Sequence, residues 1–124
     1  MKHLSTGSPF EKTMGYSRAV VKGGWCFVSG VTGYDYATME MPPDIVAQGR
    51  ACFATIDRVL REAGFSMADI VRVQYTVIDA RLVDALVPVL GAALGSIRPA
   101  ATLVIAGLMR PEILVEIEVT AFKG

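Results

Sequence analysis

The sequence has little charge, a single histidine and no clustered cysteines. Charged residues make up 19% of its 124 residues, hydrophobic residues make up 52%, and the 12 basic residues cancel the 12 acidic ones. No run of like charge forms the concentrated basic patch that a nucleic-acid-binding surface needs. Cys26 and Cys52 are isolated and His3 is the only histidine, so neither a metal-ligand spacing nor a redox CxxC pair is present. We therefore expect no nucleic-acid partner, no metal and no cofactor, and two buried free thiols.

Long hydrophobic runs are also absent. The longest apolar stretches, such as residues 100–109, are far shorter than the roughly 20 residues that a membrane-spanning helix needs. The N-terminus lacks the apolar segment of a secretory signal, so the expected location is the cytoplasm, away from membranes. A single domain over residues 1–124 with so few charged residues has little polar cover for its surface. We interpret the apolar excess as a subunit interface, which makes a second copy of the chain the expected partner.

The hydrophobic pattern predicts an α+β domain. Gly23 and Gly24 separate two strand-like segments and give a strong hairpin signal, because both positions tolerate positive φ. Asp44 suits a helix start, and the apolar positions that follow recur at helical spacings until Gly64, a typical C-cap residue. Residues 1–14 are expected to be extended, and Pro88 weakens the pattern of the second helix. The strands are expected over residues 17–22, 25–31, 70–78, 102–106 and 113–121, and the helices over residues 45–63 and 82–94.

The order of these elements is ββαβαββ, with two helices that can cover one face of the sheet. The other face then has no cover within the chain, so its apolar residues call for another copy. Residues 102–106 are continuously apolar, which predicts a strand buried on both faces. In the last strand Glu116 and Glu118 alternate with apolar residues, so both carboxylates are expected on the face opposite the core.

Short motifs follow one another in a specific order along residues 15–121. They are Gly15-Tyr16-Ser17, Phe27-Val28-Ser29-Gly30, Gln48, Ala63-Gly64, Asp69-Ile70-Val71, Asp79, Pro99-Ala100 and Glu116-Ile117-Glu118. This ordered set resembles the RidA/YjgF family of small trimeric enamine/imine deaminases, once labelled L-PSP endoribonucleases. The resemblance implies a chorismate-mutase-like fold, a homotrimer around a barrel-like core, and clefts between subunits that bind a small molecule.

The same resemblance suggests the site residues. Glu116 matches the glutamate that positions or activates the hydrolytic water, and a partly desolvated carboxylate suits a general base. Tyr16 matches a tyrosine that lines the cleft, Ser29 a hydroxyl near the bound carboxylate, and Gly30 permits a close backbone approach to the ligand. The alternative interpretations are that Glu116 is a surface carboxylate, that Tyr16 is a packed tyrosine, and that the Ser29 hydroxyl is hydrogen-bonded to the backbone of its strand.

Ala101 departs from the family pattern. The family's deaminases carry there an arginine that grips the substrate carboxylate through two hydrogen bonds, and alanine supplies neither charge nor donor. Losing such a contact at a buried site costs about 2–5 kcal/mol. Leu103 replaces a frequent cysteine and makes this part of the binding site more apolar. Arg98, Arg18 and Arg110 are candidates for a substitute cation, although each also fits a solvated surface residue.

Two classes of function follow. The leading hypothesis is a RidA/YjgF-like homotrimer that binds a small organic molecule between subunits and hydrolyses an enamine, imine or similar labile C–N bond with Glu116 as the base. The lack of an arginine at position 101 argues against a standard 2-aminoacrylate deaminase. The alternative is a non-catalytic trimer that binds or senses a small molecule. Ribonuclease activity is a weaker alternative, because the chain lacks a basic patch.

Overall fold

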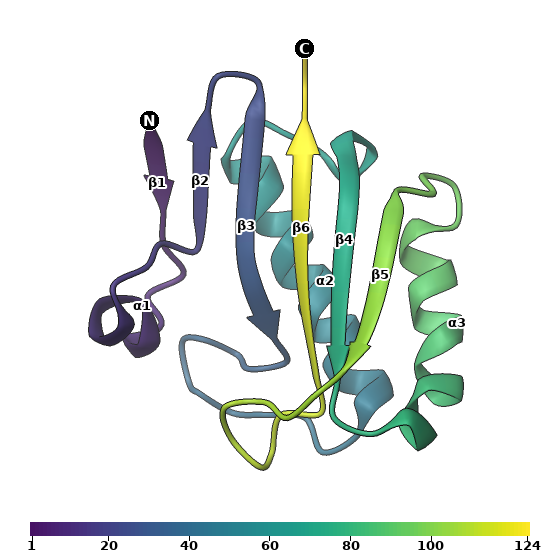
Figure 1. Cartoon of the computed structure of the whole chain (residues 1–124). Helices are drawn as coiled ribbons and strands as arrows, with labels where there is room; N and C mark the ends of the chain where they lie inside the picture. The colour runs from purple at the N-terminus through teal and green to yellow at the C-terminus, as the bar shows by residue number, and fades with distance from the viewer.

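The computed structural model describes all 124 residues and contains one six-stranded sheet with two long helices behind it (Figure 1). Two short 3₁₀ turns, Met67–Asp69 and Ala80–Leu82, precede β4 and α3. The elements are β1 (Lys2–Leu4), α1 (Pro9–Met14), β2 (Ala19–Lys22), β3 (Trp25–Thr32), α2 (Ile45–Glu62), β4 (Ile70–Val77), α3 (Val83–Leu94), β5 (Ala100–Ile105) and β6 (Val115–Phe122). The predicted α+β class and its ββαβαββ core are confirmed.

The sheet has the strand order β1-β2-β3-β6-β4-β5, in which β4 and β5 run parallel and all other neighbours run antiparallel. The predicted hairpin joins β2 to β3, with Lys22 paired to Trp25. The C-terminal strand β6 lies between β3 and β4. This arrangement brings the first and last thirds of the chain together at the middle of the sheet.

The long helix α2 forms as its sequence predicts. The Asp44 side chain caps its N-terminus and accepts a hydrogen bond from the backbone N–H of Ala47 at 2.8 Å. Cys52, Ile56 and Leu60 have no exposed surface and face the sheet. The alternation of β6 is also confirmed, because its apolar residues are buried against the helices while its polar residues lie on the other face.

The N-terminal segment corrects one prediction. Residues 1–14 are not simply extended, because β1 adds an edge strand to the sheet and α1 forms one short helix beside it (Figure 1). Ser8 caps α1, Pro9 occupies its first turn, and Gly15 ends it with a φ of 73°. A six-residue helix is too short to show a hydrophobic period, so only these capping residues marked it in the sequence.

The strand β5 corrects a second prediction. Residues 102–106 were expected to be buried on both faces, yet all six residues of β5 are exposed. The strand lies at the edge of the sheet and pairs only with β4, so its apolar side chains meet no further strand. Leu103 is 37% exposed and Ile105 is 47% exposed. A run of apolar residues shows that a segment prefers burial, but it does not show which partner provides it.

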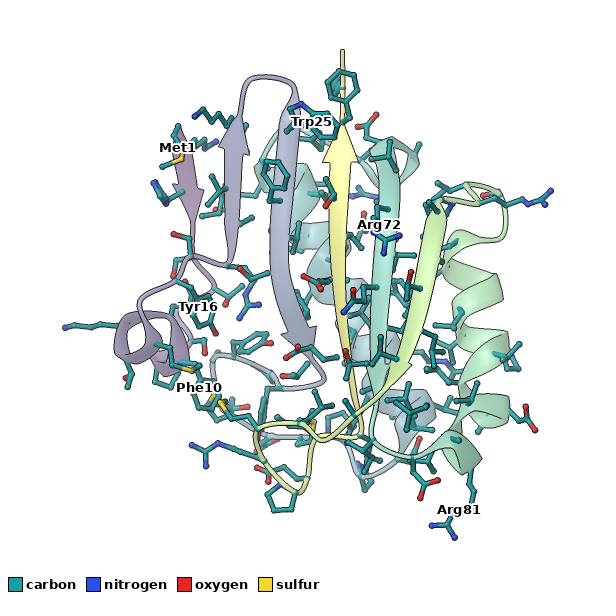
Figure 2. All side chains as sticks on the ribbon, in the orientation of Figure 1. Met1, Phe10, Tyr16, Trp25, Arg72 and Arg81 are labelled. Atoms are coloured by element: carbon teal, nitrogen blue, oxygen red, sulfur yellow. The ribbon has the colours of Figure 1, made fainter.

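The face of the sheet away from α2 and α3 is open. At one end it carries Trp25, Phe27 and Phe122, which we call the aromatic cluster; Figure 2 shows Trp25 at this end. The Trp25 ring lies 4.6 Å from that of Phe122 and 6.1 Å from that of Phe27, centre to centre. All three side chains are at least 40% exposed.

None of the helices combines the length and hydrophobicity needed to cross a bilayer.

Candidate functional site

A cavity of about 360 Å³ lies at the end of β3 and β6 remote from the aromatic cluster. Its walls are built by the segment that includes α1, by the loops that contain residues 34–36 and 107–109, and by the two strands. Its lining residues are Phe10, Met14, Tyr16, Ser29, Gly30, Thr32, Tyr34, Tyr36, Gly107, Leu108, Met109, Ile113 and Glu116. Four of the predicted site residues, Tyr16, Ser29, Gly30 and Glu116, therefore meet here. A larger hollow of about 730 Å³ lies against α2 and contains none of them, so the smaller cavity is the candidate site.

The register of β3 and β6 places Glu116 in this cavity. Between Val28 and Val31 the pairing shifts, so that Ser29 and Gly30 together oppose a single residue of β6. Such a bulge bends the strand and re-aims its neighbours, and bulges of this kind are frequent beside active sites. The half-buried Glu116 carboxyl packs directly on Gly30, because a Cβ at Gly30 would lie 2.6 Å from its Cδ and Oε1 atoms. The close approach expected at Gly30 is made by Glu116 itself.

The surroundings of Glu116 change its acidity. Burial raises the pKa of its carboxyl above the usual value, the negative charge of Glu118 raises it further, and the positive charge of Arg18 opposes both effects. The net pKa is raised. A carboxylate shifted in this direction is a stronger proton acceptor, and a carboxyl with a raised pKa in a cavity is a candidate catalytic group.

Arg18 is not the solvated residue that its position in the sequence indicated. Its side chain is buried, with 1% exposure, and Nη1 donates a hydrogen bond to the backbone carbonyl of Gly30 at 2.7 Å. Nη2 makes a longer contact of 3.4 Å with the Tyr16 hydroxyl, and the guanidinium lies 4.7 Å from the centre of the Tyr36 ring. Nε has no hydrogen-bond partner. Arg18 therefore contacts residues that line the cavity but does not line the cavity itself.

Tyr16 and Ser29 have different capacities for a ligand. The Ser29 hydroxyl donates to the backbone carbonyl of Ser17 at 2.6 Å, so its proton is used and only its lone pairs remain. The Tyr16 oxygen accepts from Arg18, which leaves its own proton free to point into the cavity. Tyr16 is therefore the hydrogen-bond donor on this wall, and Ser29 serves as an acceptor.

Two loops that border the cavity are tied to each other. The Tyr34 hydroxyl donates to the Glu112 carboxylate at 2.5 Å, and burial, with that carboxylate, raises the pKa of Tyr34 to about 12. The Gln48 side chain, 1% exposed, donates to the carbonyls of Pro42 at 2.8 Å and Glu112 at 3.0 Å. Its oxygen accepts from the N–H of Leu114 at 2.9 Å. Sequence reasoning noted Gln48 only as part of a motif, because its loop partners lie more than 60 residues away.

Three predicted binding residues lie elsewhere in the chain. Ala101 and Leu103 belong to the edge strand β5, which β4 separates from β6, and Arg98 lies in the turn before β5 with a φ of 56°. None of them lines the cavity. No group of three or more His, Cys, Asp or Glu side chains is arranged to hold a metal ion.

The architecture and the sequence motifs match those of known proteins. The family model described as Endoribonuclease L-PSP matches residues 6–123. The chain belongs to the RidA/YjgF family. A solved RidA/YjgF relative, Rv2704 of Mycobacterium tuberculosis, is 37% identical, covers 98% of each chain and superposes with a TM-score of 0.90.

Two further relatives support this RidA/YjgF assignment. The structure of RidA from the Antarctic bacterium Psychrobacter sp. PAMC 21119 is 28% identical, covers 99% of each chain and has a TM-score of 0.88. A RutC family protein of Pyrococcus abyssi is 30% identical over 109 residues, which cover 87% of this chain and 86% of that protein. The family resemblance therefore extends over nearly the whole chain.

Proposed function

We propose that this RidA/YjgF family member is a homotrimeric hydrolase that acts on the C–N bond of small enamines or imines. The observation that carries the proposal is Glu116, a half-buried carboxyl with a raised pKa in a cavity of about 360 Å³. The cavity is large enough for a small organic molecule. Tyr16 supplies a hydrogen-bond donor on the same wall.

The residues present suit a simple hydrolytic sequence. The Glu116 carboxylate takes a proton from water while the water oxygen attacks the imine carbon, and the nitrogen takes a proton from solvent, so that a neutral tetrahedral carbinolamine forms. The Glu116 carboxyl then returns its proton to the nitrogen. As the C–N bond breaks, the Glu116 carboxylate removes the hydroxyl proton, and ammonia and a carbonyl compound leave. Loss of that proton to solvent restores the carboxylate. An enamine reaches the same path after it tautomerises to the imine. The Tyr16 hydroxyl is placed to orient the substrate by hydrogen bonding.

The cavity walls favour a substrate without a carboxylate. Apolar side chains, among them Phe10, Met14 and Leu108, cover one side of it, and no arginine or lysine lines it. Ala101 offers no cation on β5, and Arg18 is too deeply buried to contact a ligand directly. We therefore propose neutral imines as the preferred substrates, in place of 2-aminoacrylate and other imino acids.

A homotrimer is part of this proposal. The open sheet face carries the aromatic cluster, and the exposed edge strand β5 adds further apolar side chains. Large exposed apolar surfaces of this kind mark subunit interfaces. In such a trimer β5 of a neighbouring copy supplies Ala101 and Leu103 to the cleft, which accounts for their absence from the cavity of their own chain. The cytoplasmic location stays a prediction.

The experiment compares two substrate types and two proteins. An amine oxidase releases neutral imines in situ, an amino-acid oxidase releases carboxylated ones, and ultraviolet absorbance follows their decay above the spontaneous rate. We expect the unmodified protein to accelerate decay of the neutral imines, and Ala101→Arg to gain activity towards the carboxylated ones. Preference of the unmodified protein for imino acids would contradict the proposed substrate class.

The missing arginine at Ala101 also favours a second candidate, a trimer that binds a small molecule without turnover. That candidate predicts a rise in melting temperature with added imine analogues, because a ligand that binds only the folded state stabilises it. It also predicts no acceleration of imine decay in either assay. Turnover by the purified protein would exclude it.

A further inference from the structure

Arg18 is buried without an ion-pair partner. It contributes to neither of the two salt bridges in the chain, which join Arg61 to Asp57 and Arg81 to Asp79. Its guanidinium has five N–H donors, of which one makes a short bond to Gly30 and one a long contact to Tyr16, while Nε has no partner. Burial of a charge is unfavourable unless opposite charges or good hydrogen bonds offset it. The incomplete pairing of Arg18 therefore needs a physical reason.

The reason lies in the acids that surround Arg18. Its positive charge lowers the pKa of Glu116 on β6, and also that of Glu11 on α1, which is 7% exposed. The Glu11 carboxylate is already hydrogen-bonded to the backbone and hydroxyl of Thr6, at 3.1 and 2.9 Å. Glu116 has no such hydrogen-bond donor, so Arg18 is the main source of compensation for its charge.

The same guanidinium also holds the backbone on which Glu116 rests. Nη1 donates to the Gly30 carbonyl at 2.7 Å, within the bulge of β3. The Glu116 carboxyl packs against the Cα of that glycine without space for a Cβ. The charged head of Arg18 and the carboxyl of Glu116 thus both contact Gly30.

We propose that Arg18 is the positioning residue for Glu116: its guanidinium fixes the Gly30 carbonyl of the bulge on which the Glu116 carboxyl packs, and its positive charge favours the ionised form of that carboxyl. The catalytic consequence rests on the proposed function, whereas the effect on Glu116 itself does not. Other groups near Glu116 cannot take over this role. Glu118 on the same strand repels its charge, and Cys52 of α2 and Tyr36 of the adjoining loop are neutral because burial raises their pKa values.

The direct test is a carbon-13 NMR titration of the Glu116 carboxyl, assigned by its loss in Glu116→Gln. In Arg18→Gln we expect the pKa of Glu116 to rise further above its usual value, because a nearby opposite charge is removed. Arg50→Gln removes the same charge from the exposed side of α2 and is the control, with no expected change. An unchanged Glu116 pKa in folded Arg18→Gln would overturn the proposal.

Arg18→Lys covers the case in which the glutamine variant does not fold. Lysine keeps the charge but lacks the planar fork that reaches Gly30 and Tyr16 together. We expect a smaller rise of the Glu116 pKa and a clear displacement of the Gly30 amide resonance. If the pKa and the Gly30 resonance both stay as in the unmodified protein, Arg18 does not position Glu116.

The pH profile of imine hydrolysis separates this role from simple structural support. In Arg18→Gln the acid limb of kcat/KM should move to higher pH by the same amount as the NMR pKa, with activity recovering at alkaline pH. A uniform loss at every pH would show damage to the fold and contradict the proposed role. If the unmodified protein hydrolyses no imine, the proposed function fails, yet the NMR titration still decides the effect of Arg18 on Glu116.

Discussion

The two ends of the central strand pair β3–β6 differ in what they expose. At one end Trp25, Phe27 and Phe122 present aromatic rings on an open face; Figure 2 labels Trp25 there. At the other end the same two strands carry a half-buried carboxyl, Glu116, beside a bulge whose Gly30 carbonyl accepts a hydrogen bond from the buried Arg18. The hydrogen-bonded ladder continues through both ends, so the difference comes from side chains and from the bulge.

This contrast favours different roles for the two ends of the strand pair. The aromatic end has regular pairing and no charged side chain among its paired residues, which suits packing against another surface. The cavity end departs from regular pairing at Ser29 and Gly30 and carries charges that are poorly compensated. Irregular backbone and incomplete polar pairing destabilise a fold, so their concentration at one end favours a functional role there.

The largest expected effect is the loss of subunit association when a residue of the aromatic cluster is replaced by a charged one. Phe27→Asp places a charge in the proposed interface and should weaken subunit association by about 2 kcal/mol or more per site, because an aromatic anchor is lost and a carboxylate is desolvated. Sedimentation velocity should then show a monomer, whereas we expect a trimer for the unmodified protein. Lys22→Asp, an exposed change at the same end of the hairpin, is the control. A trimer that survives Phe27→Asp would remove the aromatic cluster from the interface.

At the cavity end, Gly30→Ala should displace the Glu116 carboxyl without unfolding the protein. The added Cβ collides with the Glu116 carboxyl, whose flexible side chain can rotate away at small cost to stability. A displaced base loses its alignment with the water, so kcat should fall by about 100-fold. Thermal unfolding should change by only a few degrees. Full activity in folded Gly30→Ala would show that the observed position of the carboxyl does not matter.

Gln48→Ala should loosen the two loops of the cavity end while leaving the aromatic end intact. It removes three hydrogen bonds and leaves the carbonyl of Glu112 and the N–H of Leu114 without their side-chain partner. We expect a loss of about 1–3 kcal/mol in urea unfolding. Hydrogen exchange should increase in residues 106–114 and remain unchanged in β2. Unaltered exchange in that loop would mean that Gln48 does not tie it down.

The smallest effect is a gain in stability from Glu116→Gln. Because the pKa of Glu116 is raised in the folded protein, the stability that its protonated form contributes is present below the unfolded value of 4.5 and is lost as pH rises through the folded pKa. At neutral pH the neutral glutamine should therefore raise the melting temperature slightly. The difference should vanish at low pH, where Glu116 is protonated in both states. A lower melting temperature at neutral pH would contradict the raised pKa.

Much of the scaffold was predictable because its signals are local. The helical spacing before Gly64, the cap at Asp44 and the alternation around Glu116 depend on residues close in sequence, and the structure confirms them. The ordered motifs also led to Tyr16 and Glu116, which meet in one cavity.

The remaining features depend on distant partners. Arg18 is buried because the bulge at Gly30 offers it a carbonyl, and that bulge arises from the register between strands more than 80 residues apart. The exposure of Leu103 follows from the edge position of β5, which a run of apolar residues does not specify. The short helix α1 had too few residues to show a period.

The central claim is that Glu116, and not merely any carboxylate on β6, is the base for C–N bond hydrolysis. Its most direct test is imine hydrolysis by Glu116→Gln and Glu118→Gln, measured side by side under single-turnover conditions. Glu118 lies two residues along the same strand, on the same face but exposed and outside the cavity. We predict a loss of about 100-fold or more for Glu116→Gln, as expected for removal of a general base, and a nearly unchanged rate for Glu118→Gln. Equal rates in the two variants would contradict the claim.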